Sequence, residues 1–289
     1  MRWFWLFLGA VVAVALCPVV LHAWTPGTHI YLAESILSQV QSIPGIIGEL
    51  LRAFPHDYLY GSIAADTSFA KKYAPKGRHP HAWHVAQEIH DAAPSDALKA
   101  FGLGYLSHLA ADVIAHNHFI PRQLVFSRGP AGVAHAYWEA RAESHLGSRY
   151  SRDAMDLLQM DHTPADRLLD TVLSPTLFSI PTNRRMFRGM VRIADQRTFQ
   201  ATVRLAEELS GVPLHEDDLG RHLDRSRDAI FALLTGDDTA LRDTDPSGEA
   251  SLTAARMARK ELLSVGRNDV GRLQEEGERR FGLEPVRRR

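Results

Sequence analysis

The sequence contains a single cysteine, and its position removes sulfur chemistry from most of the chain. Cys17 is the only cysteine among 289 residues, so no intramolecular disulfide can form. Lipid attachment at Cys17 is disfavoured, because Leu16 stands where a small residue is expected before a lipidated cysteine and Pro18 follows. Whatever stabilises this fold is therefore not a disulfide.

The sequence also has no large excess of charge of one sign, no strand-like alternation of apolar residues and no nucleotide-binding motif. The formal net charge of −1 argues against bulk electrostatic binding to nucleic acid, although it leaves room for a local basic patch. We find no strand-like alternation, internal repeat, glycine-rich phosphate loop or serine elbow. With 45% hydrophobic residues, the chain is long enough for a sizeable core, and we predict an all-α protein.

Apolar residues recur at helical spacing along the whole chain. The segments that we expect to be helical include residues 30–37, 45–51, 59–65, 85–89, 100–112, 131–146, 155–158, 168–173, 190–209, 223–234 and 252–265. Breaks are expected at Pro175, Pro181, Pro213 and residues 243–248, and residues 71–78 form a basic loop. The basic end, with Arg279, Arg280 and residues 287–289, is interpreted as a solvated tail, with binding to anionic lipid as the alternative.

The first 23 residues have the pattern of a secretory signal. Arg2 supplies the positive start, residues 4–20 form an apolar run, and Leu21-His-Ala23 is a plausible cleavage site before Trp24. We therefore predict an exported protein, periplasmic or secreted; the alternative is that the segment remains as a membrane anchor. An exported protein without disulfides is consistent with a domain stabilised by metal.

Three histidines and an aspartate occur within eleven residues of otherwise apolar chain, at His108, Asp112, His116 and His118. On a helix, His108 and Asp112 lie one turn apart on the same face. The apolar run 100–107 before them indicates that this face is buried, so the polar groups need a partner. Zinc satisfies imidazole nitrogen and carboxylate oxygen together, whereas the alternative is a set of buried histidines bonded to one another.

A second pair with the same spacing, His135 and Glu139, follows on another helical segment. Nine of the fifteen histidines fall between residues 79 and 145, which indicates a multinuclear metal site. Asp66 ends an apolar segment, where a carboxylate is unusual unless it is a surface cap. Spacing alone does not choose a ligand among the histidines of segment 79–84.

The pattern resembles zinc-dependent bacterial phospholipase C, which shares an all-helical fold and a three-zinc site with the single-strand-specific zinc nucleases. The family's ligands run as an N-terminal Trp, a His, an Asp, a His, then His-x3-Asp-x5-His, then His-x3-Glu. The positions that match in order, over about residues 24–147, are Trp24, His29, Asp66, His81, His108, Asp112, His118, His135 and Glu139.

The resemblance implies three zinc ions, two of which share Asp112 as a ligand. They are Asp66, His81, His108 and Asp112 for the first; His118, His135 and Glu139 for the second; and His29 with the α-amine and carbonyl of Trp24 for the third, to which Asp112 bridges. Neighbouring zincs lower the pKa of a shared water to produce hydroxide, and Asp66 beside it could act as general base.

Two ligand positions stay open in the sequence. His116 competes with His118, and the family spacing favours His118, whereas a single helical row through His108 and Asp112 favours His116. Among the histidines of segment 79–84, His81 is preferred because a helix follows it, and His84 is the runner-up.

The resemblance implies a domain organisation and a function. We expect a signal peptide at 1–23, a three-zinc catalytic core at 24–150 and a helical region at 151–289 that continues or covers the core. The expected activity is phospholipase C-type hydrolysis of phospholipid at a membrane surface. The alternatives are a single-strand nuclease, for which Trp83 and Trp138 would be the stacking aromatics, and a non-catalytic zinc-stabilised binding domain.

Overall fold

The structure is a computed structural model that describes residues 24–67, 78–127, 130–173, 180–194, 201, 203–205, 207–208, 212–264 and 269–283. Within these ranges the chain forms helices and no strand, which confirms the predicted all-α fold. The expected signal segment with Cys17, most of the basic loop 71–78, Pro175 and residues 287–289 lie outside the described residues. Among the helices that are described, none has the length and apolarity needed to cross a membrane.

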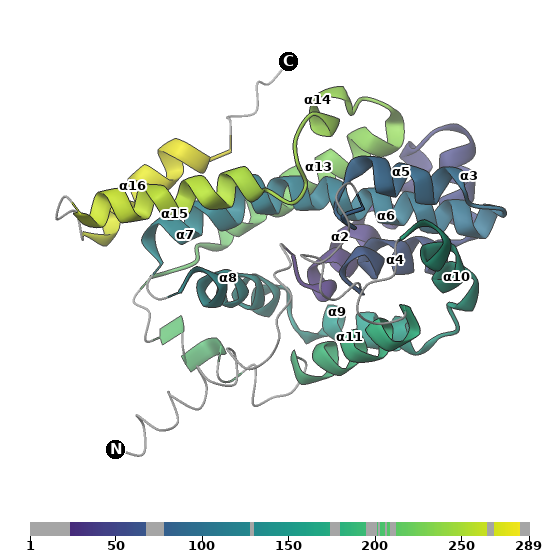
Figure 1. Ribbon diagram of the computed structural model, residues 1–289, viewed down its shortest axis with the longest axis horizontal. Helices are drawn as coiled ribbons and strands as arrows, with labels where there is room; N and C mark the ends of the chain where they lie inside the picture. The colour runs from purple at the N-terminus through teal and green to yellow at the C-terminus, as the bar shows by residue number, and fades with distance from the viewer. Residues whose placement is uncertain are drawn as a thin grey trace.

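Figure 1 shows how the described helices are arranged in space. In chain order they are α2 (Pro26–Ser38), η1 (Val40–Ser42), α3 (Gly45–Ala53), α4 (Pro55–Ala64), η2 (Ala65–Thr67), α5 (Trp83–Asp91), α6 (Asp96–Ile114), the π-helix η4 (Ala115–Phe119), α7 (Ile120–Phe126), α8 (Ala131–Leu146), α9 (Ser148–Gln159), α10 (Thr163–Val172), α11 (Ile180–Ala194), α13 (Glu216–Thr235), α14 (Thr239–Arg242), α15 (Glu249–Ser264) and α16 (Val270–Phe281).

The expected segment boundary at Pro181 is present, because α11 begins one residue before it, at Ile180; proline is tolerated there since first-turn amides have no partner within the helix. One expectation about local structure is wrong. Arg279 and Arg280 are not in a tail: they lie in the last turn of α16, where both pair with Glu276, at 2.6 and 2.5 Å.

Helix α6 is the centre of the molecule, and nearly all of its side chains are buried. Its start is capped by Ser95, whose hydroxyl accepts a hydrogen bond from the backbone N–H of Leu98 at 3.4 Å. Helix α4 packs closely along it, because Gly104 leaves room for the backbone: a Cβ there would lie 2.1 Å from the carbonyl oxygen of Tyr58. This close crossing brings the end of α4, and with it Asp66 on η2, against the middle of α6.

The helices that follow residue 150 pack against the earlier ones. Helix α13 lies along α6, and α15 and α16 lie along α7, as Figure 1 shows. On the other side, α9 contacts α2 and α11 contacts α9. The part of the chain after residue 150 therefore shares a packed interior with the part before it.

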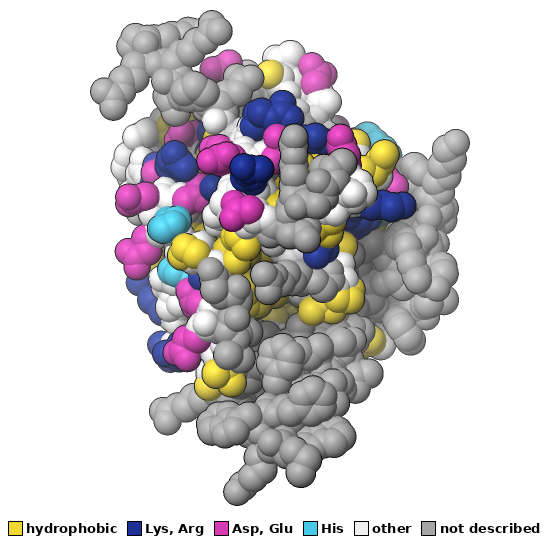
Figure 2. Space-filling view, turned by 90° about the vertical axis from the view of Figure 1, so that its left-hand side faces the viewer, with side chains coloured by type: hydrophobic (Ala, Val, Ile, Leu, Met, Phe, Trp, Pro, Cys, Tyr) yellow, Lys and Arg dark blue, Asp and Glu magenta, His cyan; other side chains and the backbone are white. Residues whose placement is uncertain are grey.

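Charged side chains of both signs are mixed on one end of the molecule. Figure 2 shows lysine and arginine side chains interspersed with acidic ones on this face, next to a group of hydrophobic side chains. This mixture agrees with the net charge of −1.

Candidate metal centre

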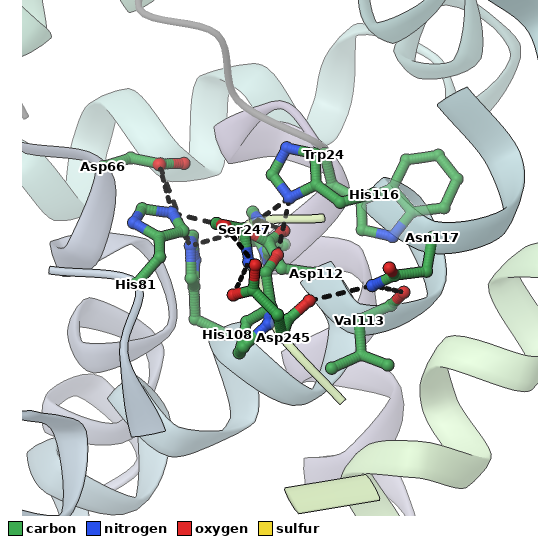
Figure 3. A network of polar contacts seen from close by, with 12 residues as sticks. Trp24, Asp66, His81, His108, Asp112, Val113, His116, Asn117, Asp245 and Ser247 are labelled. Carbon is green, nitrogen blue, oxygen red and sulfur yellow. Dashed lines mark hydrogen bonds and ion pairs between the residues drawn. The ribbon is translucent and has the colours of Figure 1, made fainter. Parts of the chain in front are cut away.

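Five ionisable side chains from four separate segments meet inside the fold. His29 comes from α2, Asp66 from η2, His81 from the segment before α5, and His108 and Asp112 from α6. All are buried, with 0 to 3% of their surface exposed. Figure 3 shows how Asp66, His81, His108 and Asp112 point toward one another.

Asp112 lies at the centre of this cluster. Its Oδ1 atom is 3.4 Å from Nε2 of His29, and its Oδ2 atom is 3.2 Å from Nε2 of His81 and 3.3 Å from Nε2 of His108. Asp66 approaches from the other side, with Oδ1 3.3 Å from Nε2 of His81 and 3.8 Å from Nε2 of His108. Ligand atoms of His81, His108 and Asp112 all lie within 4.8 Å of one another, and so do those of His29, Asp66 and His108.

The cluster has the chemistry of a metal site. Among the described residues, neither carboxylate oxygen of Asp112 finds a hydrogen-bond donor in good geometry and Nε2 of His29 finds no partner, although these atoms are buried. Leaving buried polar atoms without hydrogen bonds is costly. A divalent zinc ion prefers imidazole nitrogen and carboxylate oxygen ligands, so the donor set fits zinc.

Hydrogen bonds outside the cluster orient the histidines. His108 donates its Nδ1–H to the carbonyl oxygen of Ser62 at 2.9 Å, which directs its Nε2 lone pair into the cluster. The hydroxyl of Tyr105 donates to the carbonyl oxygen of Pro80 at 2.9 Å and so holds the backbone immediately before His81. Ser62 and Pro80 act through backbone carbonyls, which leave no signal in the sequence, and Tyr105 stands there within the apolar run 100–107.

Burial and charge act in opposite directions on these groups. Burial alone would raise the pKa of Asp112, but the adjacent histidines, His108 above all, hold it well below its usual value. Burial would lower the pKa of His108, yet the charges of Asp112 and Asp66 raise it above the ordinary value. Burial dominates at His29 and lowers its pKa to about 4. The metal-free cluster thus favours an ionised Asp112.

A second buried cluster lies beside the first. Nε2 of His135 is 2.8 Å from Oε1 of Glu139, one turn along α8, and the ring of His116 lies 5.6 Å from that of His135. Burial raises the pKa of the Glu139 carboxyl to about 7. His116 connects the two clusters, because its Nδ1 is 3.8 Å from Oδ2 of Asp112.

His118 lies in the same π-helix, η4, as His116, and its Nδ1 forms a hydrogen bond with the carbonyl oxygen of Phe281, at the end of α16, at 3.1 Å. His116 continues the one-turn row that runs through His108 and Asp112, and its ring lies 5.6 Å from that of His135. This placement favours His116 as a neighbour of His135, and the choice of His118 as the ligand from the family spacing stays a prediction.

The three histidines of segment 79–84 lie in different environments. His84, on α5, is exposed and His79 is half-buried, whereas His81 lies in the first cluster. His79 instead holds the local turn, because its Nδ1 accepts the backbone N–H of His81 at 3.1 Å. The identity of the zinc ligands themselves stays a prediction.

Trp24 lies beside the site at the start of the described chain. It is fully buried, its ring stacks on Phe119 at 4.9 Å, and its indole N–H donates to Oγ of Ser226 on α13 at 3.2 Å. These contacts fix the residue next to the entrance of α2, one turn before His29. The predicted zinc-binding role of its α-amine stays a prediction.

Comparison with known proteins identifies the region that contains both clusters. The family described as "Zinc dependent phospholipase C" matches residues 28–175, about half of the chain. No curated protein and no solved structure matches it. The matched region includes every residue of the two clusters, and it leaves Trp24 and the helices from α11 onward outside.

Proposed function

Because the chain belongs to the zinc-dependent phospholipase C family, we propose that it is an exported phosphodiesterase that hydrolyses phospholipid to diacylglycerol and a phosphorylated head group. The observation that supports this most is the pair of adjacent buried clusters that meet at Asp112. A purely structural zinc site needs only one closed set of four ligands. Two neighbouring sets suit a phosphodiester, whose attacking and leaving oxygens both need stabilisation.

The proposed ligand sets follow from the placement of the side chains. The first set is Asp66, His81, His108 and Asp112; the second is His116, His135 and Glu139; the third is His29 with the α-amine and carbonyl oxygen of Trp24. Three zinc ions are therefore expected. Oδ1 of Asp112 faces His29 of the third set at 3.4 Å and Oδ2 faces His81 of the first set at 3.2 Å, so its two oxygens are suited to bridging these two sets.

Zinc, when bound, supplies a Lewis acid that polarises phosphoryl oxygens and increases the acidity of a water molecule. The protein's own contribution is to hold and move a proton and to fix geometry. Asp66 is the proposed general base, because its carboxylate faces the centre of the first cluster. His108 stays oriented through Ser62, and Asp112 stays ionised through its histidine neighbours.

The proposed partner is a phospholipid at a membrane surface, and the proposed location is periplasmic or secreted, on the basis of the signal pattern in residues 1–23.

The deciding experiment combines zinc analysis of the mature protein with assays on phosphatidylcholine, sphingomyelin and single-stranded DNA. Release of diacylglycerol that is lost after chelation of zinc and in Asp66→Asn supports the proposal. Activity on DNA alone would assign the protein to the nuclease branch, and full zinc loading without any hydrolysis would make it a binding domain.

A further inference from the structure

We propose that the loop of residues 243–248, outside the region that matches the family, is a positioning element of the metal centre that orients His116 as a ligand. This inference rests on the proposed zinc site but not on the substrate. The loop joins α14 to α15 and contacts both η4 and the segment just after His81. It is called the 243–248 loop below.

The first contact fixes the histidine ring. Nδ1 of His116 lies 2.8 Å from the carbonyl oxygen of Pro246. A carbonyl oxygen can only accept a hydrogen bond, so Nδ1 must carry the proton and Nε2 keeps its lone pair. Partners of this kind set the tautomer and direction of metal-ligating histidines. The contact therefore selects Nε2 of His116 as the nitrogen available to zinc.

The second contact ties the loop to the backbone beside His116. The side-chain amide of Asn117 donates to the carbonyl oxygens of Asp245, at 2.9 Å, and Val113, at 3.0 Å. Its Oδ1 atom accepts the hydroxyl of Ser251, in the first turn of α15, at 2.7 Å. Asn117 thus connects the π-helix, the loop and α15 through its side chain.

The third contact extends the loop to the first cluster. Trp83 follows His81 by two residues, and its indole N–H donates to the carbonyl oxygen of Thr244 at 2.9 Å. The guanidinium of Arg242 lies 5.7 Å from the centre of the same ring. One short loop therefore contacts the chain next to a proposed ligand in each of the two clusters.

Gly248 makes this arrangement possible and provides the test. Its φ is +58°, and a Cβ there would lie 2.4 Å from the carbonyl oxygen and 2.5 Å from Cβ of His116. Gly236, at the end of α13, also has a positive φ, of +82°, but a Cβ there would meet nothing within 4 Å. Gly236→Ala therefore reproduces the backbone strain of Gly248→Ala without disturbing His116.

The experiment compares full-length wild type, Gly248→Ala and Gly236→Ala in zinc titrations and in visible spectra after loading with Co²⁺. We expect Gly248→Ala to bind one zinc about 10- to 100-fold more weakly, the usual cost of losing an orienting partner, with a changed cobalt spectrum. Gly236→Ala should match wild type in both measurements. Wild-type binding and spectrum in Gly248→Ala would overturn the inference, and so would equal changes in the two variants.

A milder substitution covers the case in which Gly248→Ala does not fold. Asn117→Ala removes the side-chain bonds to the loop and leaves space rather than a clash, and it should weaken the same zinc and alter the same cobalt bands. Wild-type zinc binding and a wild-type cobalt spectrum in Asn117→Ala would count against the positioning role.

A wild-type protein that binds neither zinc nor Co²⁺ would instead overturn the proposed metal centre itself, whereas metal binding without lipid hydrolysis would overturn only the proposed substrate.

Discussion

Nε2 of His81 lies 3.1 Å from Nε2 of His108, and both atoms also face Oδ2 of Asp112, at 3.2 and 3.3 Å. Nδ1 of His108 is bonded to Ser62, so the two facing nitrogens can share at most one hydrogen bond. Nε2 of His81, Nε2 of His108 and Oδ2 of Asp112 therefore lie close together with at most one hydrogen bond between the two nitrogens. A cation that all three atoms ligate would stabilise this arrangement.

Removal of zinc should therefore destabilise the protein as well as inactivate it. The buried oxygens of Asp112 find no well-aligned hydrogen-bond donor among the described residues, so we expect the thermal midpoint to fall on the order of 10 °C when zinc is removed, which corresponds to several kcal/mol for a chain of this size. Calorimetry before and after chelation measures the change, and added zinc, but not magnesium, should reverse it. Unchanged thermal stability after complete zinc removal would contradict a structural contribution.

Substitution of the two neighbouring histidines should have different effects. His116→Ala should lower zinc content by about one ion per chain, because it removes a proposed ligand. His118→Ala should keep its zinc and lose only the bond to the Phe281 carbonyl, about 1 kcal/mol of unfolding free energy. Zinc analysis and urea unfolding of both variants make the comparison. The reverse pattern would support the family spacing over the placement in the structure.

Asp112→Asn should be more damaging than Glu139→Gln. Asp112 faces His29 of the third proposed ligand set and both His81 and His108 of the first, whereas Glu139 pairs with His135 on its own helix. We expect Asp112→Asn to lose more than one zinc per chain and Glu139→Gln to lose about one, since each carboxylate lost removes a ligand from the sites that it serves. Equal zinc content in the two variants would show that Asp112 does not bridge.

The mature N-terminus should be Trp24, with a free amine. The amine's ordinary pKa of about 7.7–8.0 leaves only a small cost for deprotonation by zinc near neutral pH. A protein with a few extra residues before Trp24 should therefore contain about one zinc fewer than the mature form, and N-terminal sequencing of the exported protein should begin at this residue. Equal zinc content in both forms would leave Trp24 with a packing role only, through Phe119 and Ser226.

Asp218→Asn should destabilise the contact between α7 and α13. Asp218 accepts hydrogen bonds from Arg122 at 2.5 Å and Arg221 at 2.8 Å, and loss of its charge should cost about 1–3 kcal/mol. On the same helix Asp224 pairs with Arg227 at the surface, at 3.1 Å, so Asp224→Asn is a matched control expected to change stability by less than about 1 kcal/mol. Urea unfolding distinguishes the two, and equal losses would contradict the argument.

Periodicity and ligand spacing in the sequence were enough to predict an all-α protein and to single out most of the clustered residues. The one-turn pairs His108–Asp112 and His135–Glu139 are local facts: a helix places such residues on one face whatever the rest of the chain does. The order of matching residues likewise indicated His29, Asp66 and His81, although nothing local brings these three near α6.

What only the tertiary structure decided is where the helices meet and which partners orient each histidine. The ring of His116 lies 5.6 Å from that of His135; its Nδ1 is bonded to the carbonyl oxygen of Pro246, and Nδ1 of His118 to that of Phe281. Those partners lie more than a hundred residues away and act through backbone oxygens, which every residue carries and no sequence pattern marks. The sequence by itself determined which side chains are available for a metal; packing between distant helices decided how they are oriented.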